Sequence, residues 1–176
     1  MPKSILVINL MHIGDLLLVA PILRTLRTQF PQAHIALLAD KKLQDLVKNN
    51  QNIDELITID KKGQDDGLFP YLRFAWKLRQ RRFEWVINLH QNERASFLAA
   101  FSGAKTIVGY ATAVLRHCFT KYMLNRKAEK HQIESHFDVL RELLGVTERE
   151  DQGLEIWLDA DAKEEAAAIW QREVRH

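Results

Sequence analysis

Short apolar runs alternate with longer amphipathic stretches along this chain, and this alternation constrains its fold more than any other feature. The first run, Ser4–Leu10 (SILVINL), is typical of a buried strand. It is followed by Asp15–Gln29, in which apolar residues recur every three or four positions, as on one side of a helix. Pro31 prevents that helix from continuing. The chain therefore begins with a strand, a turn and a helix.

The same alternation continues to the end of the chain. Further strands are expected at His34–Asp40, Ile53–Ile59, Trp85–His90, Thr106–Gly109 and Glu155–Leu158. Further helices are expected at Lys42–Lys48, Pro70–Arg82, Glu93–Phe101, Gln132–Leu144 and Asp161–Val174, with Gly145 as a C-cap. Residues 111–130 fit neither pattern. The order predicts an α/β fold, a Rossmann-like doubly wound parallel sheet that is covered on both faces and binds ligands where its strands end.

Composition narrows the class of protein. A chain of 176 residues with 7 Gly and 4 Pro is expected to form one domain, without a flexible linker. The 25 basic and 23 acidic residues leave a net charge of +2, too small to predict a nucleic-acid partner. The single cysteine, Cys118, fits a reducing compartment, and no apolar run is long enough for a spanning helix. We expect a cytoplasmic protein.

The turn after the first strand, Asn9–Asp15, holds one glycine, Gly14, where a dinucleotide site requires three. A Walker lysine motif is also missing from the sequence, so NAD binding and P-loop chemistry are not expected. The turn instead carries Asp15 at a helix N-terminus. Asp15 is interpreted either as a helix cap or as a general base at the binding edge.

Metal sites are not predicted. Asp159-Ala160-Asp161 imitates the Asp-x-Asp of many sugar transferases, but Glu164 follows Asp161 by three residues, which is typical of a helix start. We interpret the motif as a cap. His131 and His136 are five residues apart and point to different sides of a helix.

Positive charge is clustered in two places. The first cluster lies on the helix expected at Pro70–Arg82 and comprises Arg73, Lys77, Arg79, Arg81 and Arg82. We expect it to be a solvated face, with Phe69, Leu72 and Trp76 as the core stripe opposite. The second cluster comprises Arg116, Lys121, Arg126, Lys127 and Lys130. It suits an anionic ligand or an anionic membrane surface, and equally a solvated surface.

Several segments together resemble the ADP-heptose–lipopolysaccharide heptosyltransferases, glycosyltransferase family 9. They are Ile5–Ile8, Ile13-Gly14-Asp15 with Pro21, Asn52–Ile57, Trp85–Leu89, Gly103-Ala104, Val108-Gly109, and the helix from His131 to Gly145. Each motif is weak alone, but together they span nearly the whole chain in the same order as in the family.

The resemblance implies the N-terminal half of a GT-B glycosyltransferase, in which two Rossmann-like domains enclose the active site. Residues 1–160 would form the acceptor-binding domain, and residues 161–176 a helix leading to a donor-binding domain absent from this sequence. The implied reaction is transfer of heptose from ADP-heptose to the lipopolysaccharide inner core with inversion. No cofactor or metal is implied, and peripheral contact with the inner membrane is consistent with such an acceptor.

Site residues follow from the resemblance position by position. Asp15 corresponds to the proposed base that deprotonates the acceptor hydroxyl. The residues expected to contact substrate are His12, Gly14, Lys61, Lys62, His90, Gln91, Asn92, Arg116 and Arg126. Because the donor-binding motifs belong to the absent half, we expect residues 1–176 alone to transfer no sugar. Two alternatives remain open: a GT-B glycosyltransferase of other specificity, and a non-catalytic Rossmann-like binding module.

Overall fold

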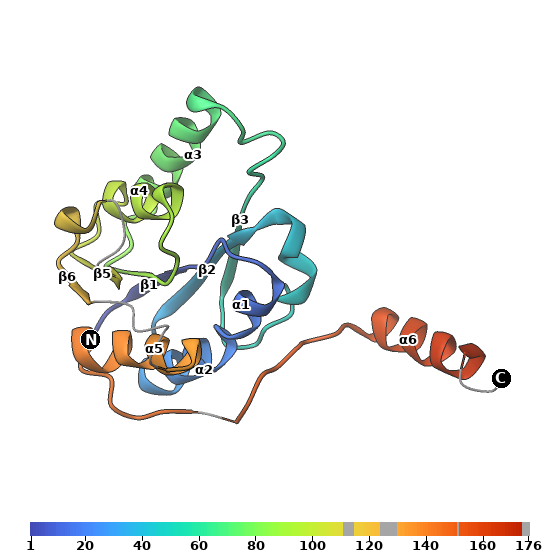
Figure 1. Cartoon of the computed structure of the whole chain (residues 1–176). Helices are drawn as coiled ribbons and strands as arrows, with labels where there is room; N and C mark the ends of the chain where they lie inside the picture. The colour runs from blue at the N-terminus through green and yellow to red at the C-terminus, as the bar shows by residue number, and fades with distance from the viewer. Residues whose placement is uncertain (111–114, 124–129, 151, 174–176) are drawn as a thin grey trace.

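The computed structural model describes residues 1–110, 115–123, 130–150 and 152–173. Within these ranges six parallel strands form one sheet in the order β3-β2-β1-β4-β5-β6 (Figure 1). The strands are β1 (Ser4–Ile8), β2 (His34–Asp40), β3 (Glu55–Ile59), β4 (Trp85–Asn88), β5 (Thr106–Tyr110) and β6 (Lys121–Met123). This strand order is that of the Rossmann fold, so the predicted α/β class is confirmed.

The order of the strands reverses at the centre of the sheet. Ile8, the last residue of β1, lies opposite Leu38 of β2 on one side and opposite Asn88 of β4 on the other. From there the chain builds outward to β3 in one direction and to β6 in the other. The loops that follow β1 and β4 therefore diverge, which is the position where such folds bind ligands. We call the edge at which all strands end the carboxyl edge.

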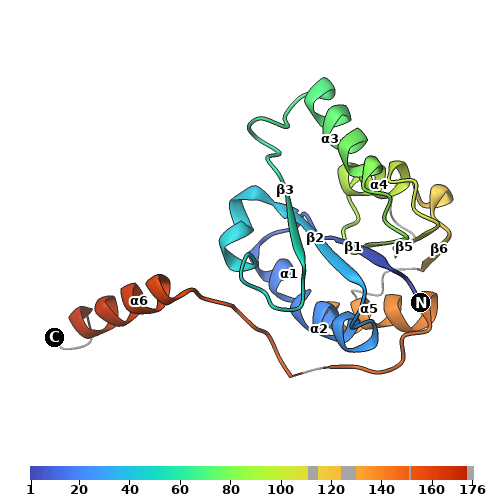
Figure 2. The same cartoon turned by 180° about the vertical axis from the view of Figure 1, so that it is seen from behind.

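Helices cover both faces of the sheet (Figures 1 and 2). The α-helices are α1 (Ile13–Leu17), α2 (Ala20–Gln29), α3 (Leu68–Gln80), α4 (Glu93–Phe101), α5 (Gln132–Asp138) and α6 (Ala160–Glu173). The shorter turns are η1 (Lys41–Leu46) and η2 (Arg116–Cys118), both 3-10, and the π-helical η3 (Val139–Leu143). Within the described residues, no helix has the length and apolar character needed to cross a membrane.

Alternate residues of each strand enter two separate cores. Ile5 and Val7 pack with α1, α2, α5 and η3 on one face. Leu6 and Ile8 pack with α3 and α4 on the other. Because β1 is buried on both faces, it needs the continuous apolar sequence by which it was predicted.

Two predicted helices are confirmed with altered form. The helix expected over Asp15–Gln29 is two helices, because Pro21 lies at the start of α2, where it has no amide hydrogen to continue the bonds of α1. The helix expected over Gln132–Leu144 changes from α to π at Val139. It ends as predicted at Gly145, which has a φ of 73°.

The sixth strand was expected in the wrong place. Residues 155–158 form no strand, and the chain there runs along α2, where Arg24 pairs with Glu155 and donates to the Glu150 carbonyl at 3.2 Å. Leu154, Ile156 and Leu158 are exposed, so the alternation that imitated a strand does not face the sheet. The sixth strand is instead β6, in the stretch whose pattern was ambiguous.

The side of α3 that packs on the sheet also differs from the prediction. Phe69, Leu72 and Trp76 are exposed rather than part of the core. The core side consists of Ala75 and Leu78, which are buried, with Tyr71 and Phe74 packed beside them. Two apolar stripes with helical spacing share this helix, and spacing alone does not decide between them.

The C-terminal helix stands apart from the sheet. Figure 1 shows α6 at the end of an extended segment, beyond the layer that contains α2. Its first turn is capped by Asp159, whose Oδ1 accepts from the Ala162 amide at 2.8 Å. The acidic motif is thus a cap, as expected, but Asp159 rather than Asp161 is the capping residue. The hydrogen bond from Ala162 lowers the pKa of Asp159.

Candidate functional site

The turn after β1 is held in place by Asn9, a buried residue. Its Nδ2 donates to the Asp15 carbonyl at 3.2 Å, and its Oδ1 accepts from the Met11 amide at 3.0 Å. The two bonds close the chain around Gly14 and position α1 above the end of β1. Sequence reasoning did not assign a role to Asn9. The available signal was a polar residue placed directly after an apolar strand, a position that is buried in this fold.

Asp15 is the third residue of α1 and does not cap it. The N-cap is His12, and no side chain caps that end of the helix. Within the described ranges, the Asp15 carboxylate makes no hydrogen bond or ion pair, and the residue is half-buried. The interpretation of Asp15 as a helix cap is therefore wrong. Its carboxylate remains available to a ligand at the carboxyl edge.

A cleft of about 440 Å³ opens beside this turn. It is lined by Met11, His12, Ile13, Gly14, Asp40, Lys42, Leu43, Lys61 and Lys62. The structure thus brings together four residues that the sequence selected from two separate loops: His12, Gly14, Lys61 and Lys62. A Cβ on Gly14 would meet no atom within 4 Å, so the turn presents bare backbone to the cleft.

Lys61 and Lys62 have different surroundings. The ammonium of Lys61 donates to the Leu10 carbonyl at 2.8 Å and pairs with Asp40 at 2.9 Å. It therefore joins the loop after β3 to the ends of β1 and β2. Lys62 is exposed and has no ion pair among the residues that the structure describes. Of the two lysines, Lys62 is the one whose charge is free for a ligand.

Asp40 is the acidic partner in this cleft. Partial burial raises the pKa of its carboxyl, but the hydrogen bonds from Lys61 and from the Lys42 amide outweigh that effect. The net result is a pKa below the ordinary value. Asp40 therefore remains ionised and offsets Lys61.

The loop after β4 approaches from the neighbouring strand. His90 and Gln91 are half-buried there, and the His90 amide donates to Asn88 Oδ1 at 3.2 Å. The side chain of Asn92 caps α4 by accepting from the Ala95 amide at 2.8 Å. The loop thus follows β4, the neighbour of β1, but His90, Gln91 and Asn92 do not line the cleft beside Gly14, and the oxygen of Asn92 is engaged by the helix.

The remaining basic residues expected at the site are not brought into the cleft beside Gly14. Arg116 lies in η2, in the crossover between β5 and β6 and close to α4. Arg126, with Lys127, lies outside the described residues. Two more members of this cluster bond within the fold: Lys121 donates to the Leu143 carbonyl at 3.1 Å, and Lys130 pairs with Asp138.

The histidines that were considered as metal ligands have structural contacts. His131 caps α5, with Nδ1 accepting from the Ile133 amide at 3.3 Å, and buried His136 bonds to the hydroxyl of Tyr110. Burial raises the pKa of Tyr110, so its hydroxyl stays protonated at neutral pH. In the part of the chain that the structure describes, no group of three or more His, Cys, Asp or Glu side chains could hold a metal ion.

Comparisons with known proteins agree on one family. The sequence model described as glycosyltransferase family 9 (heptosyltransferase) matches residues 71–174. The crystal structure of a family 9 glycosyl transferase from Veillonella parvula DSM 2008 is 35% identical, with a TM-score of 0.89, and the match covers 97% of this chain and 49% of that one.

Two proteins of Escherichia coli are more distant. Lipopolysaccharide heptosyltransferase 3 of strain K12 is 27% identical over 140 residues, which cover 77% of this chain and 40% of that protein. The ADP-heptose LPS heptosyltransferase II structure is 18% identical, with a TM-score of 0.70, and shares the fold over 97% of this chain and 50% of its own. The chain therefore spans two fifths to one half of the length of these relatives.

Proposed function

Because the chain belongs to glycosyltransferase family 9, we propose that it is the acceptor-binding half of a heptosyltransferase. The proposed donor is ADP-heptose, bound mainly by a second domain, and the proposed acceptor is the inner core of lipopolysaccharide. The names of two relatives, a lipopolysaccharide heptosyltransferase and an ADP-heptose LPS heptosyltransferase, support this choice of substrates. We place the reaction in the cytoplasm, at the inner face of the membrane.

The placement of Asp15 is the observation that carries the proposal. Asp15 lies at the carboxyl edge, beside the point where strand order reverses, with a carboxylate that no described residue binds. The preceding residue, Gly14, presents bare backbone to the cleft beside this turn, and the free charge of Lys62 lines the same cleft. A general base, an open approach and a cation are what an anionic sugar acceptor requires.

The proposed step is a single displacement. The Asp15 carboxylate takes the proton of the acceptor hydroxyl as that oxygen attacks the anomeric carbon of ADP-heptose. The bond from this carbon to the ADP oxygen breaks as the new glycosidic bond forms, and ADP leaves with the electron pair. Attack from the face opposite the leaving group inverts the anomeric configuration.

Acceptor binding by residues 1–176 tests the proposal without the donor. Titration calorimetry with a deacylated inner-core oligosaccharide is expected to give binding that weakens in Lys62→Met. Gly14→Val provides a second test. A Cβ at position 14 has no atom of the protein within 4 Å, so the valine side chain would fill space in the cleft and obstruct the acceptor without a clash at its Cβ. Binding that is absent, or indifferent to both substitutions, would contradict the acceptor assignment.

A transfer assay tests whether the acceptor and the donor are bound by different halves of the enzyme. Residues 1–176 with ADP-heptose and the same oligosaccharide are expected to release no ADP. A fusion of this chain to the half of the Veillonella relative that it does not match is expected to restore transfer. Measurable transfer by residues 1–176 alone would contradict the proposal that donor binding lies in a second domain.

A further inference from the structure

Helix α3 exposes large apolar side chains that its packing does not require. Four of them, the α3 patch, are exposed to solvent: Leu68 by 68%, Phe69 by 83%, Leu72 by 39% and Trp76 by 55%. The helix already buries a second apolar side, with Ala75 and Leu78 in the core under α3 and α4. The α3 patch therefore does not contribute to the packing of the core, and an exposed apolar cluster of this kind marks an interaction surface.

The spacing of the patch places it on one side of the helix. Phe69, Leu72 and Trp76 are three and four residues apart, so they project from α3 in nearly the same direction. Trp76 is anchored at its base, where its ring lies 6.4 Å from that of Phe101. The patch is thus an apolar ridge along a 13-residue helix, with Trp76 in contact with α4.

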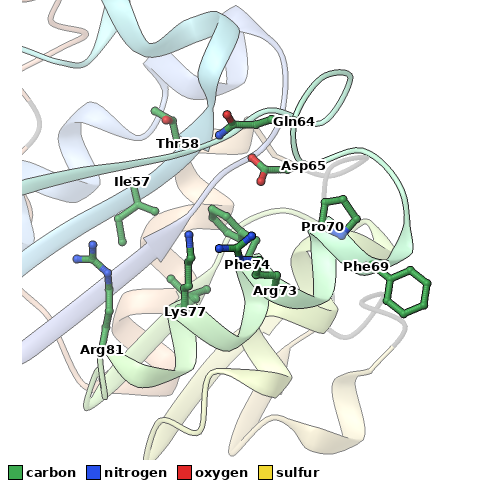
Figure 3. Close-up of a pocket in the computed structure, with 11 residues that line it drawn as sticks. Ile57, Thr58, Gln64, Asp65, Phe69, Pro70, Arg73, Phe74, Lys77 and Arg81 are labelled. Carbon is green, nitrogen blue, oxygen red and sulfur yellow. The ribbon is translucent and has the colours of Figure 1, made fainter.

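Positive charge borders this ridge: three basic residues, Arg73, Lys77 and Arg81, line the cleft beside it, against one acidic residue, Asp65. Residues 68–83 contain five basic and no acidic side chains. Arg73 and Lys77, one turn apart, have no ion pair among the residues described here, while Arg81 pairs with Glu55 of β3. Figure 3 shows Lys77 of α3, and Arg81 directly after the helix, extending toward β3 across a cleft of about 650 Å³ that Phe69 also lines. The cleft gives an anionic group access to Lys77 from the side.

We propose that the α3 patch, together with Arg73 and Lys77, binds the surface of an anionic phospholipid bilayer. A helix with Trp, Phe and Leu on one side and Lys or Arg beside them is the arrangement that lies in the membrane interface. The apolar side chains enter between the headgroups, and the two cations contact lipid phosphates. A second copy of this chain suits the patch less well, because it would bring two sets of unpaired cations together.

The position of α3 suggests a role for membrane binding in presenting the acceptor, and this role rests on the proposed function. The helix begins directly after the loop that carries Lys61 and Lys62, at the carboxyl edge of the sheet. In Figure 1, α3 projects beyond the body of the domain on the side of that loop. A bilayer bound there would lie next to the cleft that we assign to the acceptor, whose proposed natural form is anchored in lipid.

Vesicle sedimentation tests the proposal and requires neither donor nor acceptor. Residues 1–176 are expected to sediment with phosphatidylcholine vesicles containing about a third phosphatidylglycerol, less with pure phosphatidylcholine, and less as salt is raised. Arg73→Gln with Lys77→Gln should lower the partition coefficient about 25-fold, near fivefold for each charge. Phe69→Ser with Trp76→Ser should lower it about tenfold or more.

A matched control removes the same charge elsewhere. Lys163 and Arg172 are exposed on α6, which stands beyond α2, on the face of the sheet opposite α3. Lys163→Gln with Arg172→Gln is expected to change the partition less than threefold, because charges beyond a Debye length of about 10 Å are screened. Unchanged melting temperatures in all variants would confirm that each remains folded.

Three results would overturn the proposal: no sedimentation with anionic vesicles, equal losses in the control and patch variants, or a patch-dependent dimer that ignores vesicles. None of them bears on sugar transfer. Conversely, a failure of acceptor binding with intact vesicle binding would overturn the proposed function and leave the membrane surface standing.

Discussion

Replacing Lys61 or Lys62 by methionine separates two neighbouring residues that the sequence treats alike. Lys61→Met removes a charged hydrogen bond to the Leu10 carbonyl, 2.8 Å long, and a 2.9 Å ion pair with Asp40. Both partners are largely shielded, with 23% of the Lys61 side chain and 15% of the Asp40 side chain exposed. Lys62→Met removes an exposed charge without a described ion pair. We expect the first substitution to destabilise the fold and the second to weaken only acceptor binding.

The magnitude follows from the bonds that are lost. A hydrogen bond from a charged donor contributes about 1.5–3 kcal/mol, and a partly shielded ion pair about 1 kcal/mol more. The side-chain entropy that methionine regains offsets about 1–2 kcal/mol. The net loss for Lys61→Met is therefore about 2 kcal/mol, or roughly 4–8 °C in melting temperature for a chain of this length. Lys62→Met should stay within about 0.5 kcal/mol of the parent.

The pH dependence of the stability lost in Lys61→Met shows how much of it comes from the ion pair with Asp40. The lowered pKa of Asp40 means that its ion pair stabilises the fold above the unfolded pKa of about 3.9, and that this contribution disappears as pH falls through the folded pKa. Urea unfolding from pH 7 downward should show the gap between parent and Lys61→Met narrowing by about 1 kcal/mol below about pH 4. Equal stability of the two variants at pH 7, or a gap that widens with acid, would refute this account of Lys61.

Two further substitutions test the packing of the sheet and its electrostatics. Gly109→Ala would place a Cβ 2.7 Å from the Asn88 carbonyl oxygen and 2.7 Å from the Phe119 ring. We therefore expect the free energy of unfolding, measured in urea, to fall by about 1–3 kcal/mol. An unchanged free energy of unfolding would contradict the close approach of β4 and β5. Asp54 is partly buried, which raises its pKa, but bonds from the Ile35 amide and from Arg27 lower it overall. Asp54→Asn should therefore cost about 1 kcal/mol at pH 7, after allowance for solvent screening, and progressively less below about pH 4; a cost independent of pH would contradict this.

Most of the central sheet could be predicted, because a short and continuously apolar run fits a strand that is buried on both faces. Ser4–Leu10 and His34–Asp40 contain β1 and β2, two interior strands of the sheet, and their continuous apolar character fits burial on both faces. The turn after β1 was also identified, since the carboxyl end of a central strand is where this fold binds ligands.

The predictions from sequence were wrong or incomplete where the local pattern of residues is compatible with two different structures. On α3, one stripe through Trp76 and another through Leu78 both have helical spacing, and only the packing of Ala75 and Leu78 into the core between the sheet and α4 decides which is buried. At Glu155, alternation predicted a strand, but Arg24 of α2 holds that segment away from the sheet. The roles of Lys61 and Lys62 could not be separated, because the partner of Lys61 is 21 residues away in sequence and meets it only in the fold.

The rate of transfer after Asp15→Asn tests the central claim most directly. In the fusion with a donor-binding half, this isosteric change keeps the shape of the side chain but removes its capacity to take a proton. We expect kcat to fall by about 10²–10⁴, with the KM for the acceptor changed only a few-fold and the melting temperature unchanged. A kcat equal to that of the parent would contradict the assignment of Asp15 as the base.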